Sequence, residues 1–324
     1  MITSLITGVG GFVASHLADL LLEKGEKVIG TYRWTEDLGK IEHIKDKINL
    51  VPCDLLDLSS FFRAIKEFKP DYIYHLAAQS YVSDSYSNPI VTIETNTVGT
   101  VNLLEAIRLV KEESPSYNPI VHICSTSEVY GLVKEEDLPI KETQPLNPGN
   151  PYAIGKLGGD MAALVYWTNF GIKTLRTRAF THTGPRRTML SAECNFARQI
   201  ALIEKGKQEP IIYHGNLDSI RTWTDVRDMA EAYYQLVRKC KPGEVYNICG
   251  ETVKTIGEML DYLISLSPMK NEIKKIQDPK LMRPHDVSLQ VADCSKFKNE
   301  TNWKQKISFE QTMQDLLNWW RQIV

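Results

Sequence analysis

Four side chains in two short segments of the chain can together move a proton and a hydride. Thr126 and Glu128 follow an apolar run. Tyr152 and Lys156 come directly after Pro151, which suits the first turn of a helix. Because Tyr152 and Lys156 are four positions apart, a helix projects both from one face. This set suits removal of a proton and a hydride from a sugar carbinol, followed by elimination of water.

A second Tyr-x-x-x-Lys pattern, Tyr130 and Lys134, lies nearby. Gly131 and a charged stretch follow Tyr130, so we interpret this copy as a loop. Tyr152 instead begins a long apolar-periodic segment, which is typical of a helix. Tyr152 and Lys156 are therefore the predicted functional pair.

Each of the other two candidates also has a structural interpretation. Glu128 can be a solvated loop carboxylate or a helix-end partner. Thr126 can be a hydroxyl that bonds to nearby backbone. The converging arrangement is preferred because all four side chains fit one reaction.

The composition excludes several classes of protein. The chain has 324 residues and a formal net charge of -2 with both signs interspersed, unlike a nucleic-acid binder. No apolar run approaches the length of a membrane span. The first residues have the pattern of a strand and lack the basic and apolar regions of a cleavable leader. This predicts a cytoplasmic protein.

The cysteines and histidines predict neither disulfides nor a metal site. The six cysteines are not closely spaced, and several lie within apolar runs, so we expect reduced, disulfide-free thiols. The seven histidines show no metal-ligand spacing. His75 and His122 end strand-like runs, and we interpret them as structural.

The first half of the chain alternates short apolar runs with helical patterns. The predicted strands are 4–7, 27–31, 48–51, 72–75, 120–124 and 173–178. The predicted helices are 12–24, 59–68, 90–111 and 151–170. That order predicts an α/β fold, a Rossmann-type doubly wound parallel sheet with right-handed crossovers.

The character of the sequence changes after His182. Shorter elements follow, with predictions at 211–214, 226–239 and 256–265. We expect residues 1–180 to form a dinucleotide-binding domain that holds the catalytic residues. Residues 181–324 are expected to form a smaller, mixed α/β substrate-binding lobe, with some exchange of chain between the two.

The turn between the first strand and the first helix has the composition of a phosphate-binding loop. Gly8 permits a tight turn, Gly11 lets the backbone approach a pyrophosphate, and Ala14 allows close packing of helix on strand. The helix N-terminus then presents unpaired N–H groups to the phosphates. The predicted dinucleotide contacts in this turn are Gly8, Gly10, Gly11, Phe12 and Val13.

The end of the second strand selects between dinucleotides. NAD-selective sites place an acidic residue there, whereas this strand ends without a carboxylate and is followed by Arg33. We therefore predict NADP(H), with NAD(H) less favoured; a solvated surface arginine is the alternative interpretation. The remaining predicted cofactor contacts lie after the third and fourth strands or in the catalytic pair: Asp54, Leu55, Leu76, Ala77, Ala78, Gln79, Tyr152 and Lys156.

Taken together, these motifs resemble the extended short-chain dehydrogenase/reductase superfamily over essentially the whole chain. The resemblance is strongest to the GDP-sugar branch, which contains GDP-mannose 4,6-dehydratases and GDP-4-keto-6-deoxymannose reductases. The superfamily motifs are at residues 7–14, 54–55, 75–78, 96, 125–128 and 152–156. The segments that indicate the GDP-sugar branch are residues 184–187, 215–223 and 283–287.

The resemblance implies how a nucleotide sugar would be held in the smaller lobe. Arg221 and Arg283 would bind the diphosphate, for which planar guanidinium groups are suited. Surface or inter-lobe ion pairs are the alternative for such arginines. Most relatives have asparagine where Thr181 stands, so one diphosphate contact is expected to be weaker or rebuilt. The implied substrate contacts are Ser80, Thr181, Arg186, Arg187, Arg221 and Arg283.

The resemblance also implies a reaction, the conversion of GDP-mannose or a close analogue to its 4-keto-6-deoxy product. In that reaction Tyr152 would take the proton of the C4 hydroxyl, Thr126 would hold O4, and Lys156 would favour the phenolate. Glu128 would remove the C5 proton, a step that simple epimerases and ketoreductases do not need.

Three alternatives remain at the level of the sequence. The first is an NADPH-dependent reductase of a 4-keto-6-deoxy GDP-sugar. The short length of the chain and the sequence of residues 225–228 favour this alternative. The second is a UDP-glucuronate decarboxylase, and the third is a cofactor-sensing protein without chemistry. Relatives of the last kind typically lack the Tyr or the Lys, and both are present here.

Two long predicted helices, near 88–110 and 151–170, could form an interface between copies of the chain. By resemblance, the equivalent helices form a four-helix dimer contact, so we expect a homodimer or a homotetramer. Packing of the same apolar residues into the core of one chain is the alternative interpretation.

Overall fold

The computed structural model describes residues 1–282 and 287–324. Its centre is a parallel sheet of seven strands in the order β10-β6-β5-β4-β1-β2-β3. The strands are β1 (Thr3–Thr7), β2 (Lys27–Tyr32), β3 (Asn49–Pro52), β4 (Tyr72–His75), β5 (Ile120–Thr126), β6 (Lys173–Ala179) and β10 (Val245–Ile248). The order reverses between β1 and β4, where a doubly wound sheet binds its ligand. The predicted fold class is confirmed.

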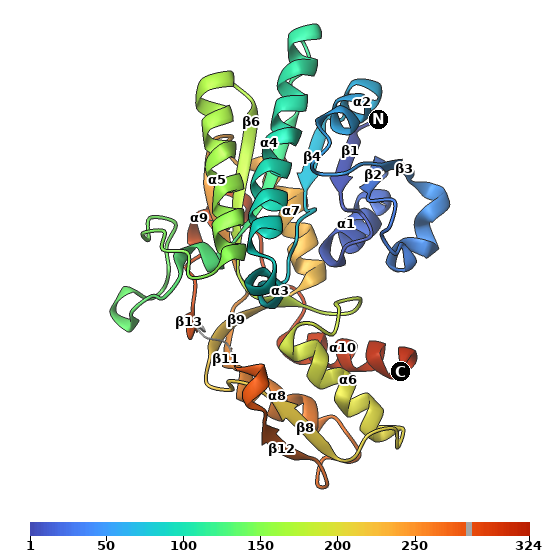
Figure 1. Ribbon diagram of the computed structural model, residues 1–324, viewed down its shortest axis with the longest axis vertical. Helices are drawn as coiled ribbons and strands as arrows, with labels where there is room; N and C mark the ends of the chain where they lie inside the picture. Colours follow the sequence, from blue (N-terminus) through green and yellow to red (C-terminus); the bar gives the residue numbers. More distant parts are fainter. Residues whose placement is uncertain (283–286) are drawn as a thin grey trace.

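Helices cover both faces of this sheet (Figure 1). Alternate side chains of β1 show the two sides: Ile6 packs into one buried cluster and Leu5 into the other. The cluster around Ile6 includes side chains of α1 (Phe12–Glu23) and α7 (Val226–Lys239). The cluster around Leu5 includes side chains of α2 (Leu58–Phe68), α4 (Pro89–Glu113) and α5 (Pro151–Phe170).

Two elements beyond residue 180 lie with the large sheet. The strand β10 pairs with β6, and α7 packs against α1. Sequence analysis predicted α7 but not β10, which has only four residues. The short helix α9 (Ser295–Thr301) packs against β10 through Phe297. The chain therefore returns to the sheet before it ends.

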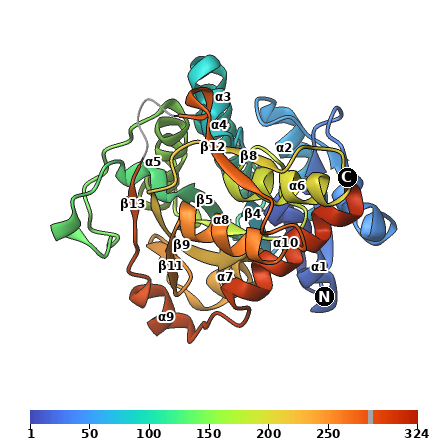
Figure 2. The ribbon, with the colours of Figure 1, turned by 90° about the horizontal axis from the view of Figure 1, so that it is seen from below.

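A smaller lobe lies beyond one end of the sheet (Figure 1), and in the view from below its helices lie in front of the strands of the large sheet (Figure 2). Its strands are β7 (His182–Thr183), β8 (Ile211–His214), β9 (Ile220–Asp225), β11 (Thr252–Thr255), β12 (Lys274–Gln277) and β13 (Leu289–Gln290). Its helices are α6 (Ala192–Glu204), α8 (Ile256–Ser265) and α10 (Phe309–Ile323). These three helices bury a core of their own against β8 and β9.

The remaining elements are short. They are α3 (Val82–Ser87) and the 3₁₀ turns η1 (Gly39–Lys47), η2 (Ser127–Tyr130), η3 (Glu135–Asp137) and η4 (Pro279–Leu281). Within the two described ranges, no helix has both the length and the apolar character needed to cross a membrane. In the same part of the chain, no group of His, Cys, Asp and Glu side chains is arranged to hold a metal ion.

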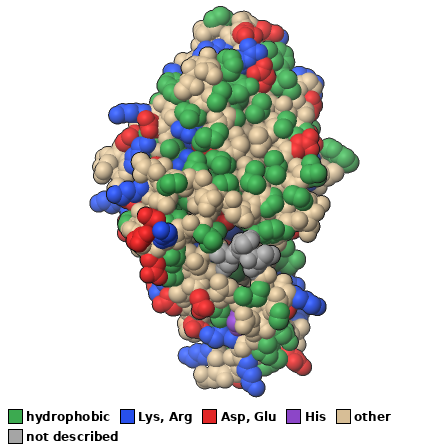
Figure 3. Space-filling model, turned by 60° about the vertical axis from the view of Figure 1, so that its left-hand side comes forward, with side chains coloured by type: hydrophobic (Ala, Val, Ile, Leu, Met, Phe, Trp, Pro, Cys, Tyr) green, Lys and Arg blue, Asp and Glu red, His purple; other side chains and the backbone are tan. Residues whose placement is uncertain are grey.

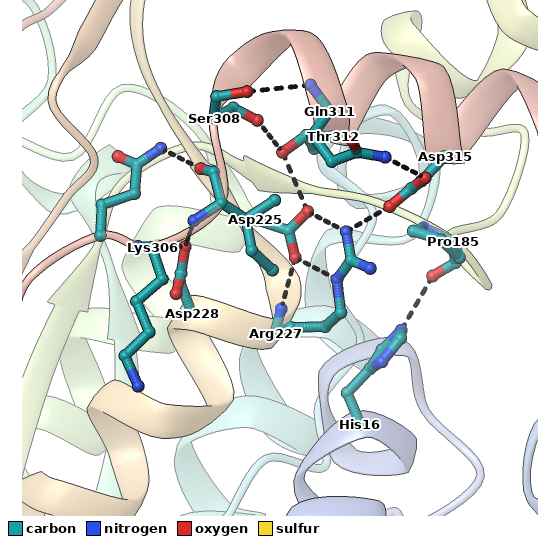
Figure 4. Close-up of polar contacts among 12 residues, drawn as sticks. His16, Pro185, Asp225, Arg227, Asp228, Lys306, Ser308, Gln311, Thr312 and Asp315 are labelled. Carbon is teal, nitrogen blue, oxygen red and sulfur yellow. Dashed lines mark hydrogen bonds and ion pairs between the residues drawn. The ribbon is translucent and has the colours of Figure 1, made fainter.

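A buried polar network fastens the smaller lobe to α7 (Figure 4). Asp225 caps α7 by accepting a hydrogen bond from the backbone N–H of Arg227 at 2.8 Å. Thr312 of α10 donates to Asp225 Oδ2 at 2.9 Å. The Arg227 guanidinium bridges Asp225 and Asp315, with N–O distances of 2.8 and 2.7 Å. The network fixes α10 relative to the start of α7.

A second set of contacts joins α1 to the start of the smaller lobe. His16 Nε2 lies 3.0 Å from the carbonyl oxygen of Pro185 (Figure 4). Burial lowers the pKa of His16 to about 4, so at pH 7 the neutral ring donates this bond through Nε2. The Phe12 ring stacks on that of His182, with centroids 6.2 Å apart. The start of α1 is therefore packed directly against the smaller lobe.

Candidate active site

Tyr152 and Lys156 lie in the first two turns of α5, beside β5. Asn150 caps this helix by accepting a hydrogen bond from Ala153 N at 2.8 Å. α5 also lies very close to α4. A Cβ atom added to Gly158 would lie only 2.3 Å from Thr97 Oγ1. Glycine on this face of α5 lets the two helices approach and sets the position of the Tyr–Lys pair.

Thr126 is the last residue of β5, and its hydroxyl reaches both neighbours in the site. The oxygen accepts a hydrogen bond from Glu128 N at 3.3 Å. Burial raises the pKa of Tyr152 well above its ordinary value, while a hydrogen bond with Thr126 acts in the opposite direction. Burial also lowers the pKa of Lys156. The structure therefore places the Thr126 hydroxyl at the Tyr152 phenol, with Lys156 buried one turn further along α5, and the catalytic role of the three residues stays a prediction.

The carboxylate of Glu128 is held between two amide side chains. Asn150 Nδ2 donates to Oε2 at 3.0 Å, and Gln290 Nε2 donates to Oε1 at 2.9 Å. Both donors need acceptor oxygens, which an ionised carboxylate supplies. Glu128 is therefore not a freely solvated loop carboxylate. It does contact a helix end, because Asn150 is the N-cap of α5, and its role as a base stays a prediction.

Sequence analysis missed both residues that hold Glu128. Asn150 had a signal, because asparagine before proline marks the start of a helix. Gln290 had none. It lies 162 positions from Glu128 and is buried in β13 of the smaller lobe. Its contact exists only because the smaller lobe packs over the end of the large sheet.

The predicted phosphate-binding turn has a geometry that fits a dinucleotide. Gly8 has a φ of +66°, and a Cβ atom there would lie 3.0 Å from Ala77. A Cβ atom on Gly11 would lie 2.9 Å from the carbonyl oxygen of Gly8. Gly11 is the N-cap of α1 and supplies no side-chain bond, so the helix N-terminus keeps donors for an anion. Thr7 Oγ1 accepts from the N–H groups of Leu76 and Ala77, both at 3.0 Å, and so holds β1 beside β4.

The other predicted cofactor contacts surround the same end of the sheet. The Asn96 side chain of α4 makes two hydrogen bonds with the backbone of Gln79. Its Oδ1 accepts from Gln79 N at 2.8 Å, and its Nδ2 donates to the Gln79 carbonyl at 3.0 Å. Asp54 accepts from Leu56 N at 2.9 Å, and the carbonyl of Leu55 accepts from Asn102 at 2.9 Å. Ala78 is half-buried beside them. These contacts shape the loops after β3 and β4; their role in binding a cofactor stays a prediction.

A carboxylate that sequence analysis overlooked lies beside the turn. Arg33 follows β2 and is exposed, and its backbone N–H donates to Glu36 Oε2 at 3.3 Å. A Cβ atom on Gly10 would lie 2.7 Å from Glu36 Oε1. Burial raises the pKa of Glu36. A tight turn, closed by a hydrogen bond from Glu36 N to the Arg33 carbonyl at 2.7 Å, brings this carboxylate back to the end of β2.

Two of the predicted substrate arginines form ion pairs close to α1. Arg186 pairs with Asp19 of α1 at 2.7 Å. Arg187 pairs with Glu193 at 2.8 Å, and its guanidinium lies over the Phe12 ring, 5.1 Å from the centroid. The Arg186 pair is of the inter-lobe kind that sequence analysis gave as the alternative for the diphosphate arginines, whereas the Arg187 pair lies within the smaller lobe with Glu193 buried. A role in substrate binding stays a prediction for both.

The other predicted substrate contacts are more dispersed. Ser80 is exposed beyond β4, and Thr181 is half-buried between β6 and β7. Arg221 is buried in β9, where Nη1 donates to the carbonyl of Ile220 at 2.9 Å. Arg283 lies outside the described residues. The predicted catalytic residues therefore lie closer together than the predicted substrate contacts among the described residues.

The second Tyr-x-x-x-Lys pattern is not a second site. Tyr130 ends the turn η2 and is buried, rather than lying in the open loop that was predicted. Its hydroxyl donates to Asn247 Oδ1 at 2.6 Å and accepts from Arg178 at 3.2 Å. Lys134 is exposed and pairs with Glu136 at 3.3 Å. Tyr130 therefore connects η2 to β6 and β10.

The fold and the Thr–Tyr–Lys constellation define an enzyme of the extended short-chain dehydrogenase/reductase class. A family model for GDP-mannose 4,6-dehydratase matches residues 5–316, and the chain belongs to that family. A GDP-mannose 4,6-dehydratase of Yersinia enterocolitica is 31% identical over 350 residues, covering 97% of this chain and 92% of the relative. A GDP-6-deoxy-D-mannose reductase of Pseudomonas aeruginosa is 30% identical over 317 residues, covering 97% and 96%.

Solved structures agree with this placement. RMD from Pseudomonas aeruginosa, complexed with NADPH, matches with a TM-score of 0.83 and 29% identity over 100% of both chains. A UDP-glucose 4-epimerase from Thermus thermophilus, in complex with NAD, matches with a TM-score of 0.85 and 26% identity, also over 100% of both. The predicted resemblance to the GDP-sugar branch is confirmed.

Proposed function

We propose that this enzyme is a GDP-sugar 4,6-dehydratase that converts GDP-mannose or a close analogue to the 4-keto-6-deoxy GDP-sugar. The observation that carries the proposal is Glu128, fixed by two amides beside Thr126, Tyr152 and Lys156. A base in addition to the Tyr–Lys pair is what elimination of water requires. The names of the dehydratase relatives support the same substrate.

The proposed mechanism divides the chemistry between the chain and a nicotinamide dinucleotide. When bound, the dinucleotide supplies a hydride acceptor for C4 and a hydride donor for C6. Tyr152 removes the proton of the C4 hydroxyl while Thr126 holds O4 by a hydrogen bond. Lys156 stabilises the phenolate through its positive charge. Burial acts against this, because it raises the pKa of the phenol. The resulting ketone acidifies the C5 proton.

Glu128 performs the second half of the reaction. Its carboxylate takes the C5 proton, and the protonated acid then gives that proton to the departing 6-hydroxyl, which leaves as water. Asn150 and Gln290 keep the carboxylate oriented through both transfers. Return of hydride to C6, together with a proton from solvent to C5, completes a cycle with no net oxidation or reduction.

The direct test is to incubate the purified chain with GDP-mannose without added reductant and to measure product mass. Loss of one water, with no net change in NADP(H), is the expected result. No change in mass, together with oxidation of NADPH when a 4-keto-6-deoxy GDP-sugar is supplied, would contradict a dehydratase and support a reductase.

The alignments favour the reductase as second candidate. The match to the Pseudomonas reductase runs over 317 aligned residues, whereas that to the Yersinia dehydratase needs 350 to cover the same share of this chain. The chain is therefore closer to the reductase in length. Glu128 and its two amide partners favour the dehydratase because reduction of a 4-ketone does not require removal of the C5 proton.

NADP(H) is the proposed cofactor, with Arg33 as the partner of a 2′-phosphate. Glu36 opposes that partner, since its carboxylate lies at the Arg33 N–H and against Gly10. Glu36→Gln should therefore raise affinity for NADP⁺ relative to NAD⁺ by about 10-fold, because it removes a like-charge repulsion. Fluorescence titration with each dinucleotide measures the ratio.

The neighbouring carboxylate Asp37 provides a matched control for this prediction. Its side chain is engaged by Gly39 N at 2.9 Å. Asp37→Asn should leave the ratio of the two affinities unchanged. An unchanged ratio in Glu36→Gln would show that Glu36 does not face the 2′ position, and an unchanged ratio in Arg33→Ala would remove the basis for NADP(H).

A homodimer through α4 and α5 is also proposed, with a homotetramer as the larger alternative. Figure 3 shows hydrophobic side chains spread over this side of the molecule. Ile90, Val98, Ile154 and Val165 of these helices are 43–77% exposed. We expect micromolar wild-type protein to sediment as a dimer. A purely monomeric wild type would contradict this assembly.

That the protein works in the cytoplasm stays a prediction.

Two valines of equal exposure make a matched pair of variants for the interface. Val165 of α5 and Val253 of β11 are both 47% exposed. Val165→Arg should shift the sedimenting species to a smaller one, because a charge would be buried in an apolar contact. Val253→Arg, in the smaller lobe, should leave the wild-type species unchanged. A smaller species in Val253→Arg and an unchanged one in Val165→Arg would show that α5 does not form the interface.

A further inference from the structure

Two buried cysteines from distant parts of the chain meet at the boundary between the large sheet and the segment that follows β13. Cys249 comes directly after β10, and Cys294 directly before α9. The two residues are 45 positions apart, yet their sulfur atoms are 2.7 Å from each other. A disulfide bond has an S–S distance of about 2.05 Å, so bond formation needs a movement of less than about 1 Å.

The surroundings of the pair favour reaction between the two sulfurs. The Cys249 thiol donates to Cys294 Sγ, and this bond lowers the pKa of Cys294. The ammonium of Lys298 acts in the same direction. Lys298 itself pairs with Glu251 at 2.9 Å, which holds it near the sulfurs. Both effects favour ionisation of Cys294, and the thiolate is the nucleophile in oxidation.

We propose that Cys249 and Cys294 form a dithiol pair that a hydroperoxide oxidises to a disulfide. The Cys294 thiolate attacks one peroxide oxygen, the O–O bond breaks, and a sulfenic acid forms with release of the first water (for hydrogen peroxide). The Cys249 thiol then attacks the sulfenic sulfur, the S–O bond breaks, and a second water leaves. Two thiols are oxidised by two electrons in total, and the peroxide is reduced by two.

The position of the pair gives the bond a defined structural effect. It would join the end of β10, in the large sheet, to the stretch between β13 and α9. Gln290, which holds Glu128, ends β13 directly before that stretch, and Ala292 within the stretch forms a bridge with Ile140. Because the sulfurs are already in contact, the bond should preserve the position of Gln290. It should also restrict the unfolded chain by closing a loop of 45 residues.

The other cysteines differ in their surroundings. Cys53 contacts Ser60 Oγ at 3.0 Å, and Cys124 contacts the hydroxyl of Tyr233 at 3.3 Å. Cys240 is buried against α7 and β10. In the contacts of the described residues, sulfur meets sulfur only at Cys249 and Cys294. Cys240→Ser is therefore a suitable matched control.

Peptide mapping of the folded full-length chain tests the proposal without relying on a variant. After hydrogen peroxide treatment and blocking of free thiols with N-ethylmaleimide, the non-reduced digest should contain one cross-linked pair spanning residues 249 and 294. Dithiothreitol should separate it. Sulfinic or sulfonic acid on Cys294 without the cross-link, or unmodified thiols at both positions, would overturn the proposal.

The melting temperature provides an independent readout. Oxidised wild type should melt about 5 °C higher than the reduced protein, as expected for closure of a long loop in a chain of this size. Cys240→Ser should keep this shift, whereas Cys249→Ser and Cys294→Ser should lose it. An equal shift in Cys249→Ser would show that the effect arises elsewhere. Both tests are independent of whether the enzyme dehydrates GDP-mannose.

Discussion

Replacing Tyr152 by phenylalanine is expected to lower turnover of GDP-mannose by about 10²–10⁴-fold. The phenol is the only group in the proposed mechanism that takes the proton of the C4 hydroxyl. Its removal should leave the fold intact, because the ring remains and the lost hydrogen bond is to Thr126 at the surface of the site. Initial rates measured at saturating GDP-mannose, with circular dichroism to compare the folds, test the prediction.

Tyr130 provides the matched control for this variant. It belongs to the second Tyr-x-x-x-Lys pattern, and its hydroxyl bonds to Asn247 and Arg178 rather than to the site. Tyr130→Phe should reduce stability, because Asn247 and Arg178 each lose a buried partner, yet turnover of the folded enzyme should remain near that of wild type. Full activity in Tyr152→Phe combined with loss in Tyr130→Phe would exchange the two assignments.

Replacing Glu128 by glutamine is expected to stop elimination of water, with a loss of about 10²–10⁴-fold in product formation. Glutamine cannot take the C5 proton. It also offers one acceptor oxygen where Asn150 and Gln290 together need two. In deuterated water the wild type should incorporate solvent deuterium at C5, and Glu128→Gln should not. Mass spectrometry of the nucleotide sugar measures both effects.

The exposed carboxylate of Glu136 serves as the control for Glu128. It lies in η3 and pairs with Lys134 outside the site. Glu136→Gln should leave both product formation and deuterium incorporation unchanged. Wild-type rates in Glu128→Gln would require another base for C5 and would remove the main support for a dehydratase.

The parts of the site that depend on local sequence were predictable. The glycine-rich turn, the end of β5 and the start of α5 each carry their own signal, and parallel strands bring them to one edge of the sheet. The end of β5 and the start of α5 therefore lie side by side as predicted, and the Thr126 hydroxyl reaches Tyr152. The strand β10 was missed because four residues carry little periodicity.

The parts that depend on distant packing were not predictable. Gln290 reaches Glu128 only through the closure of the smaller lobe, and Cys249 meets Cys294 only because α9 returns to β10. Glu36 lies beyond the end of β2 and returns to it through a tight turn. The pairing of Arg186 with Asp19 likewise depends on how the smaller lobe meets α1.

The central claim is that hydride leaves C4 of the sugar and returns to C6 within one catalytic cycle. GDP-mannose that carries deuterium at C4 tests it most directly, with NADP⁺ added in excess and the product analysed by NMR. The mechanism predicts a 4-keto-6-deoxy sugar with the deuterium at C6 and none in the free nicotinamide pool. Transfer of the deuterium to the added NADP⁺, or a product that retains its 6-hydroxyl, would contradict the account.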